Sequence, residues 1–242
     1  MRVTALARRN LSEVVRDPLS LGISLALPLV LLLTLQALGG SDDDSFLAPT
    51  RLTPGIVLFG FVMVMFSSAM ILSRDRETSL LARLLTAPVR SDEFVWGYSL
   101  PYLLVAAVQA TVLMVVGVLL GLSSSGSLLV VAAIFALMAI FFVALGMVCG
   151  STLTVAQTSG AYALVLMLTI FGGAWFDLAE IGGVFVTIGD VLPFKHALDA
   201  TRAVMADGAT LGDVAGDMAW VGGYAAVTVV LAVSVFRWRM YE

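Results

Sequence analysis

The sequence has few charged residues and almost none of the residue types that build catalytic or metal sites. Of its 242 residues, 12% are charged and 60% are hydrophobic, with one cysteine and one histidine, and the mean hydropathy is +1.03. The charged fraction is about half of that in soluble proteins. A soluble domain of this composition would have too little polar surface to stay in solution, so we predict one integral membrane domain. The lone Cys149 excludes an intrachain disulfide.

The sequence also lacks the motifs that bind nucleotides or perform catalysis. A phosphate-binding loop needs a glycine-rich turn that ends in Gly-Lys-Ser/Thr, whereas the only lysine, Lys195, follows Pro193 and Phe194. The only histidine, His196, is accompanied by no serine elbow or carboxylate dyad, so we expect a structural role for it. We predict that this chain is not an enzyme and binds no cofactor, metal or nucleic acid. If it depends on ATP, another chain hydrolyses it.

Six apolar segments are predicted to cross the bilayer, for which about 20 residues suffice. None contains Asp, Glu, Lys, Arg or His, which argues against a proton-coupled carrier, although sodium sites can be built from carbonyls and hydroxyls. The run 94–122 is too long for one crossing, so we expect its first part near the surface, with the crossing beginning close to Pro101. The predicted fold is all-α, with spans at residues 19–38, 54–73, 98–122, 128–150, 153–173 and 218–236.

Two charged stretches outside the spans have helical periodicity. Residues 1–18 place apolar residues on one side and Arg2, Arg9 and Arg16 on the other, the pattern of an amphipathic helix in the membrane interface. Residues 74–93 contain four leucines at helical spacing, and Pro88 limits the helix. This second helix would either lie on the lipid surface or bind a soluble partner. The alternative is an ordinary cytoplasmic loop with some helix.

Most of the basic residues lie in three segments outside the predicted spans, namely the N-terminal segment, residues 74–93 and the C-terminus. If the N-terminus is inside, the six crossings place both termini and residues 74–93 in the cytoplasm, as the positive-inside rule requires. Residues 174–217 then lie outside, and we expect short surface helices or a re-entrant element there, including an amphipathic helix at 194–205. Ten of the thirteen basic residues then face inward: Arg2, Arg8, Arg9, Arg16, Arg74, Arg76, Arg83, Arg90, Arg237 and Arg239.

A few small and polar residues interrupt the spans. Gly146 with Gly150, and Gly117 with Gly121, have the spacing that lets helices approach closely. The polar side chains either hydrogen-bond between helices, which we favour, or line a path for an amphipathic substrate. The candidates for lining such a path are Gln36, Ser67, Gln109 and Thr111.

Four stretches around the second and third spans resemble a known family. They read Leu-Thr-Pro-Gly-Ile-Val from Leu52, Arg-Asp-Arg-Glu-Thr from Arg74, Leu-Leu-Thr-Ala-Pro-Val-Arg from Leu84, and Gly-Tyr-Ser-Leu-Pro-Tyr from Gly97. Together they resemble the permease subunits of type-2 ABC exporters, the group of the daunorubicin-type permeases. Asp75 stands where this family often has a glutamate.

The resemblance implies how the chain would work. Residues 74–93 would form the coupling helix that docks into a separate ABC ATPase, which holds ATP and Mg. Residues 1–18 would form the connecting helix, with Arg9, Glu13 and Arg16 on it. The docking residues would be Glu77, Thr78, Leu80, Leu81, Arg83, Leu84, Leu85, Thr86 and Pro88.

The implied assembly is a pair of permease chains, identical or different, in a bacterial or archaeal inner membrane. We expect export of a hydrophobic or amphipathic substrate such as a drug, lipid or natural product. The alternatives are an exporter of a glycan or polysaccharide, an ion-coupled six-span secondary carrier, and a membrane protein that transports nothing.

Overall fold

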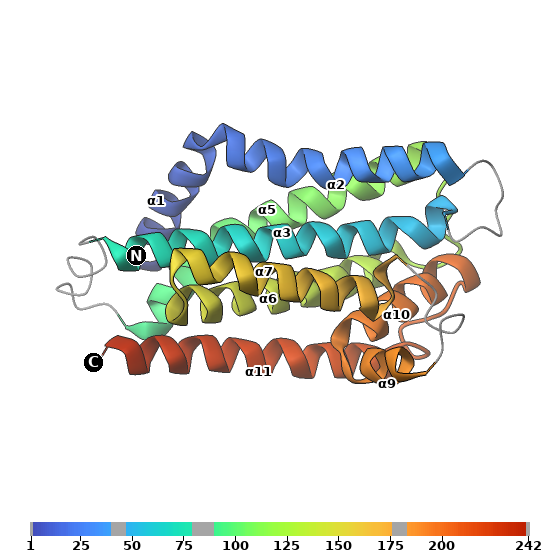
Figure 1. The fold of residues 1–242 in the computed structure, drawn as a ribbon. Helices are drawn as coiled ribbons and strands as arrows, with labels where there is room; N and C mark the ends of the chain where they lie inside the picture. The colour runs from blue at the N-terminus through green and yellow to red at the C-terminus, as the bar shows by residue number, and fades with distance from the viewer. Residues whose placement is uncertain (1, 40–46, 79–89, 176–182, 241–242) are drawn as a thin grey trace.

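The computed structural model describes residues 2–39, 47–78, 90–175 and 183–240, all as helices and their connections (Figure 1). Six helices are long and apolar enough to cross a membrane, which confirms the predicted six-span architecture. Their bounds, with those of the shorter elements, are α1 Arg2–Arg16, α2 Pro18–Gly39, α3 Pro49–Glu77, α5 Ser91–Leu119, α6 Leu128–Thr152, α7 Val155–Thr169, η1 Ile170–Ala174, α9 Val184–Val191, α10 Pro193–Asp207 and α11 Ala215–Met240.

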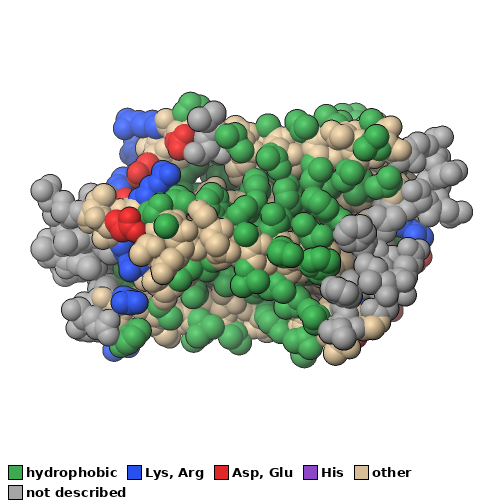
Figure 2. All heavy atoms as spheres, in the orientation of Figure 1, with side chains coloured by type: hydrophobic (Ala, Val, Ile, Leu, Met, Phe, Trp, Pro, Cys, Tyr) green, Lys and Arg blue, Asp and Glu red, His purple; other side chains and the backbone are tan. Residues whose placement is uncertain are grey.

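The long helices run side by side, and both termini lie at one end of the bundle, as Figure 1 shows. We call this the terminal end, and the end that carries α9 and α10 the far end. Figure 2 shows hydrophobic side chains over the middle of the visible face and charged ones near its ends. This distribution fits a bilayer, because burying a charge in hydrocarbon is costly. That the terminal end faces the cytoplasm stays a prediction.

Helix α3 is the centre of the bundle. In its most apolar stretch 78% of the residues are buried, against 17% in α2 and in α7. Phe61 of α3 lies between Phe135 and Phe142 of α6, with ring centroids 6.3 Å away in both cases. A helix that is apolar on all sides has no face to expose to water and is covered by its neighbours.

Glycines let α6 approach α3 closely, as their spacing predicts. A Cβ on Gly146 would lie 2.0 Å from Ser68 Oγ, and one on Gly150 would lie 2.7 Å from the carbonyl oxygen of Ala69. The second pair behaves differently. Gly117 packs on Thr53, but Gly121 has open space and a φ of +104°, so it turns the chain after α5 rather than packing against another helix.

The helix that contains the third predicted span begins before that span. We expect the crossing to begin near residue 98, and helix α5 already begins at Ser91 and runs unbroken through Pro101. Phe94 stacks on Tyr98 and on Phe236 of α11, with centroids 4.5 Å and 4.2 Å apart. This aromatic packing buries the first turns of α5, and a proline inside a membrane helix is tolerated where its neighbours compensate.

The helices on either side of the predicted 74–93 loop extend into it. Helix α3 extends through Glu77, and α5 starts at Ser91, so both ends of the predicted 74–93 loop belong to long helices. Helix α3 begins at Pro49, before the predicted span at 54–73, and proline suits the first turn of a helix because its missing backbone N–H needs no partner there. Residues 79–89, which hold most of the predicted coupling helix, lie outside the described residues.

The far end contains the shorter elements. Helix α7 continues into the π-helical turn η1, where Gly173 has a φ of +93°. Helix α10 covers the amphipathic helix predicted at 194–205, and it ends at Gly208, whose φ of +69° stops the helix. Helix α10 contacts α11 and α3, and η1 contacts α3 and α10. Ala174, Phe194 and Leu198 are among the buried residues of this region.

We expect the substitution Gly146→Ala to reduce the stability of the bundle. The new methyl group would meet Ser68 and the α3 backbone, and overpacking of this kind costs about 1–3 kcal/mol. Thermal unfolding in detergent measures the effect. Gly222→Ala is the matched control, because nothing lies within 4 Å of its added Cβ. An unchanged midpoint for Gly146→Ala would contradict the close approach of α6 and α3.

Candidate functional site

A polar cluster at the terminal end joins α1, α3 and α5. Both terminal nitrogens of Arg9 lie 3.3 Å from Oδ2 of Asp75, and Nη2 also lies 3.1 Å from Glu13 Oε2. Tyr98 donates its hydroxyl hydrogen to the same oxygen of Asp75. The Asp75 side chain is only 8% exposed, so these two donors replace the water that a carboxylate would otherwise keep.

The charge of Arg9 is preserved in this cluster. Burial alone lowers the pKa of the Arg9 guanidinium, but the contacts with Tyr98, Asp75 and Glu13 raise it, and the pKa is raised overall. Arg9 is thus a permanent cation that neutralises a buried carboxylate. The interaction connects residues 66 positions apart along the chain.

A second set of contacts fixes α1 on α5. Asn10 is fully buried and donates from Nδ2 to the carbonyl oxygen of Gly97 at 3.2 Å. A Cβ on Gly97 would lie 2.6 Å from Leu6 Cδ2, so α1 packs directly over this glycine. One side of the helix that we predict to lie in the membrane interface is therefore packed on the bundle.

The end of α3 is tied to the turn between α6 and α7 as well. Arg76 Nη1 donates to the carbonyl oxygen of Gly150 at 2.8 Å, and Ser73 Oγ lies 3.1 Å from Thr158 Oγ1. Glu77 Oε1 accepts a hydrogen bond of 2.9 Å from the backbone of Val155, in the first turn of α7. A carboxylate stabilises a helix at this position. The last turn of α3 is thus bonded to α1, α5, α6 and α7.

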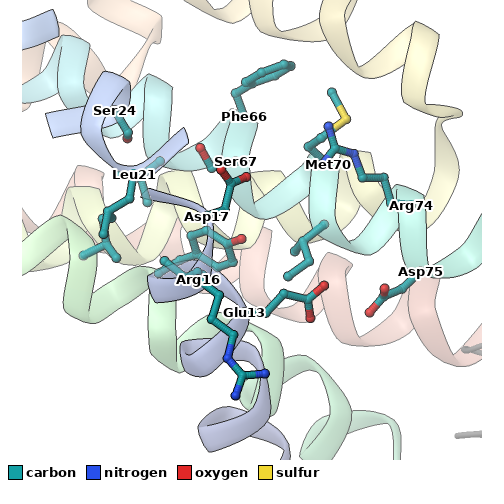
Figure 3. Close-up of a pocket in the computed structure, with 15 residues that line it drawn as sticks. Glu13, Arg16, Asp17, Leu21, Ser24, Phe66, Ser67, Met70, Arg74 and Asp75 are labelled. Atoms are coloured by element: carbon teal, nitrogen blue, oxygen red, sulfur yellow. The ribbon is translucent and has the colours of Figure 1, made fainter. Parts of the chain in front are cut away.

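A cavity of about 470 Å³ opens beside this cluster, between α1, α2, α3 and α5. Its charged rim comes from α1 and from the last turns of α3, and in Figure 3 the Glu13 side chain extends toward Asp75. Its wall is mainly apolar, with Leu21, Val64, Phe66, Met70, Ile71 and Val105. A cavity with polar groups at one end and apolar surface at the other suits an amphipathic molecule.

The structure separates the polar residues that we considered for a path. Ser67 lines this cavity, but its hydroxyl already donates to the carbonyl oxygen of Met63. Thr111 lines a different, mostly apolar cavity of about 490 Å³ between α5 and α6. Gln109 is buried and donates to the carbonyl oxygen of Ser24, and the Oε1 atom of Gln36 is buried without a partner. No single cavity of the described residues contains all four.

The predicted docking and connecting residues lie partly on α1 and at the end of α3, and partly outside the described residues. Arg9, Glu13 and Arg16 lie on α1 as expected, and the first two join the polar cluster. Glu77 and Thr78 end α3, where Glu77 contacts α7 and Thr78 Oγ1 donates to the carbonyl oxygen of Asp75. The other docking candidates, Leu80, Leu81, Arg83, Leu84, Leu85, Thr86 and Pro88, lie outside the described residues.

Sequence reasoning missed the central roles of Asp75, Tyr98 and Asn10. Asp75 was treated as part of a charged loop, and Tyr98 only as part of a motif. One signal was present in the spacing. The buried side of the second span continues for one more turn into Arg-Asp-Arg-Glu, where Asp75 follows Leu72 by three residues and so lies on that side. No local pattern identifies Arg9 of α1 as the partner of Asp75, because the two residues are 66 positions apart in the sequence.

A separate cluster surrounds His196 at the far end. Its Nδ1 lies 2.6 Å from Asp217 Oδ1 on α11, and its Nε2 lies 2.9 Å from the carbonyl oxygen of Asp190 on α9. Both partners are acceptors, so only the doubly protonated imidazolium donates to both. Lys195 pairs with the carboxylate of Asp190, and the indole of Trp220 lies 5.5 Å from the imidazole. This supports the structural role expected for His196.

These features define a multi-pass, all-α membrane protein in which an N-terminal helix packs on a bundle that, within the described residues, has six candidate membrane-spanning helices. Residues 1–206 match the family described as ABC-2 type transporter, which is most of the chain. The chain belongs to this family and is the membrane permease of an ABC transporter, as the sequence motifs predicted. A comparison with curated proteins finds no match.

We expect Arg9→Gln to destabilise the protein by about 1–3 kcal/mol, because it leaves the buried carboxylate of Asp75 without its cation. Loss of a partner from a fully buried pair costs more, but Arg9 is one-third exposed, and water weakens the effect. Thermal unfolding in detergent measures it, with exposed Arg8→Gln as the control, expected within about 0.5 kcal/mol. Equal midpoints for the two variants would contradict the role of Arg9.

The cluster around His196 predicts a dependence of stability on pH. Burial lowers the pKa of the His196 imidazole, but the hydrogen bonds to Asp217 and Asp190 raise it, and the pKa is raised overall from 6.5. Since the folded protein holds this proton more tightly, the stabilisation is complete below pH 6.5 and is lost as the pH rises through the folded pKa. The wild type should exceed His196→Gln in unfolding midpoint at pH 5.5, with a smaller difference at pH 8.5. A difference that does not change with pH would show that His196 is not protonated.

Proposed function

We propose that this permease is the membrane subunit of an ATP-driven exporter and that a separate ABC ATPase binds to the connection between α3 and α5. The observation that carries the proposal is the polar cluster at the terminal end. Residues 79–89 are preceded by the last turn of α3 and followed by the first turns of α5, and Asp75 and Tyr98 bond these two helices to each other and to Arg9 of α1. A force applied to this connection therefore acts on three bonded helices together.

The proposed docking set spans both sides of this connection. Glu77 and Thr78 contribute from the end of α3, and Leu80, Leu81, Arg83, Leu84, Leu85, Thr86 and Pro88 from the coupling helix. ATP and Mg would be bound by the ATPase, and this chain would bind neither. The N-terminal helix α1 would move with the coupling helix through Arg9.

Two permease chains would form the translocation pathway. The support is the exposed apolar surface of α2 and α7, where only 17% of the most apolar stretch is buried in each helix. Such surface needs lipid or a second chain to cover it. Whether the second chain is identical or different follows from purification of the complex.

The substrate class that we propose is hydrophobic or amphipathic, such as a drug, a lipid or a natural product. The mainly apolar wall and charged rim of the cavity beside α1 support it. Positive charge at the terminal end favours a cytoplasmic location for that end, in a bacterial or archaeal inner membrane. A glycan exporter or an ion-coupled carrier would be the alternative reading of the same six spans.

The substitution Leu84→Asp tests the ATPase docking site. We expect it to uncouple the permease from its ATPase, with a loss of about tenfold or more in ATP-driven export, because a carboxylate would be buried in an apolar contact. Reconstituted vesicles that contain the permease and its co-purified ATPase give the measurement. Ser123→Asp adds the same charge to an exposed turn at the opposite end of α5 and is the control.

Two results would contradict the proposal. Full substrate-stimulated ATPase activity in the Leu84→Asp complex would exclude this docking site. Transport by the purified permease alone, driven by an ion gradient without ATPase or ATP, would identify a secondary carrier instead.

A further inference from the structure

The charges around the cavity beside α1 balance one another. Its lining contains three carboxylates and two guanidinium groups, those of Glu13, Asp17, Asp75, Arg16 and Arg74. Arg9, which bonds both Glu13 and Asp75, brings the third positive charge. A headgroup with charge of a single sign would therefore find as many repelling as attracting groups.

The two arginines of the lining come from different helices and point in different directions. In Figure 3, Arg16 points away from the other labelled side chains, whereas Arg74 reaches over Met70 from α3. Within the described part of the chain Arg74 forms no salt bridge, and Glu13 is bonded by Arg9 through one oxygen only. The Glu13 carboxylate on α1 therefore faces a guanidinium on α3, with hydrogen-bonding capacity left on both.

Deeper in the cavity there is a buried hydroxyl without a partner. Ser24 of α2 lines the cavity, is 6% exposed, and its Oγ forms no hydrogen bond. Helical hydroxyls elsewhere in the protein bond the carbonyl four residues before, as those of Ser12 and Thr152 do. A buried hydroxyl left unbonded costs about 1–3 kcal/mol, which a ligand oxygen would recover.

We propose that this cavity binds an amphiphile whose zwitterionic headgroup carries a phosphate and a primary ammonium, the chemistry of a phosphoethanolamine lipid. Arg74 would bond the phosphate, and Glu13 would accept hydrogen bonds from the ammonium. Ser24 would donate to an ester or phosphate oxygen below them. The acyl chains would lie along the apolar wall. A lipid that is only bound and a lipid that is transported would make the same contacts at this site. The proposal therefore does not depend on the ATPase partnership.

Native mass spectrometry of the purified permease in detergent tests the site. The protein is titrated with phosphatidylethanolamine or with phosphatidylglycerol of the same acyl chains. We expect about tenfold stronger retention of phosphatidylethanolamine, because phosphatidylglycerol offers no ammonium and a hydrogen bond to a charged group contributes about that factor. Free phosphoethanolamine is added as a competitor. Displacement by it at millimolar concentration would identify a soluble headgroup rather than a lipid as the ligand of this site.

Three variants assign the contacts. Arg74→Gln should weaken retention of both lipids about tenfold, because each has a phosphate. Glu13→Gln should remove the preference for phosphatidylethanolamine. Ser24→Val fills the cavity and breaks no hydrogen bond of the hydroxyl, so it should weaken binding without loss of stability. Arg237→Gln, on the exposed end of α11, is the matched control and should behave as the wild type.

Equal retention of the two lipids by the wild type would overturn the proposal, as would unchanged binding in both Arg74→Gln and Ser24→Val. The comparison of lipids on the wild type needs no variant, so the proposal stays testable even if Glu13→Gln fails to fold. ATP-driven export by the intact complex is a separate measurement. Failure of the lipid site would therefore not be confused with failure of the coupling proposal.

Discussion

The ion pair between Arg9 and Asp75 is the interaction on which the terminal end of this permease depends. It puts a carboxylate in a buried position, and Tyr98 supplies a second donor to the same oxygen. Breaking such a pair is costly because one charge remains buried without compensation. The pair therefore holds α1, α3 and α5 in one arrangement, even though α1 precedes the spans and would otherwise lie loosely in the interface.

The rest of the bundle is built around α3, and its helices are packed against one another to different degrees. Close contacts at Gly146 and Gly150 join α6 to α3, and the last turn of α3 is bonded to the turn before α7. Helices α2 and α7 have mostly exposed apolar surface by comparison. A close-packed centre with less covered flanks transmits displacement as a unit, because packed interiors compress little. This is the property that the proposed coupling to an ATPase requires.

Much of the fold was predictable from the sequence. Six apolar runs gave the six spans, the arginine periodicity gave α1, and the amphipathic pattern at 194–205 gave α10. The helix ends were not predictable, because charged residues such as Asp75 extend a span only where a partner such as Arg9 neutralises them. Of the candidate site, α1 and the end of α3 were identified, but Tyr98 and Asn10 were not, since their roles come from contacts between distant segments.

The sequence by itself determined that this chain crosses a membrane as helices, because apolar segments of this length can satisfy their backbone in lipid only within a helix or a closed barrel. It also determined the family, through short motifs that lie close together in the chain. Only the tertiary structure decided which polar groups meet at the terminal end and where a cavity remains. Those outcomes depend on how closely helices approach, and glycine positions and side-chain volumes on distant segments set that approach jointly. Arg9 and Tyr98, for example, are 89 residues apart in the chain.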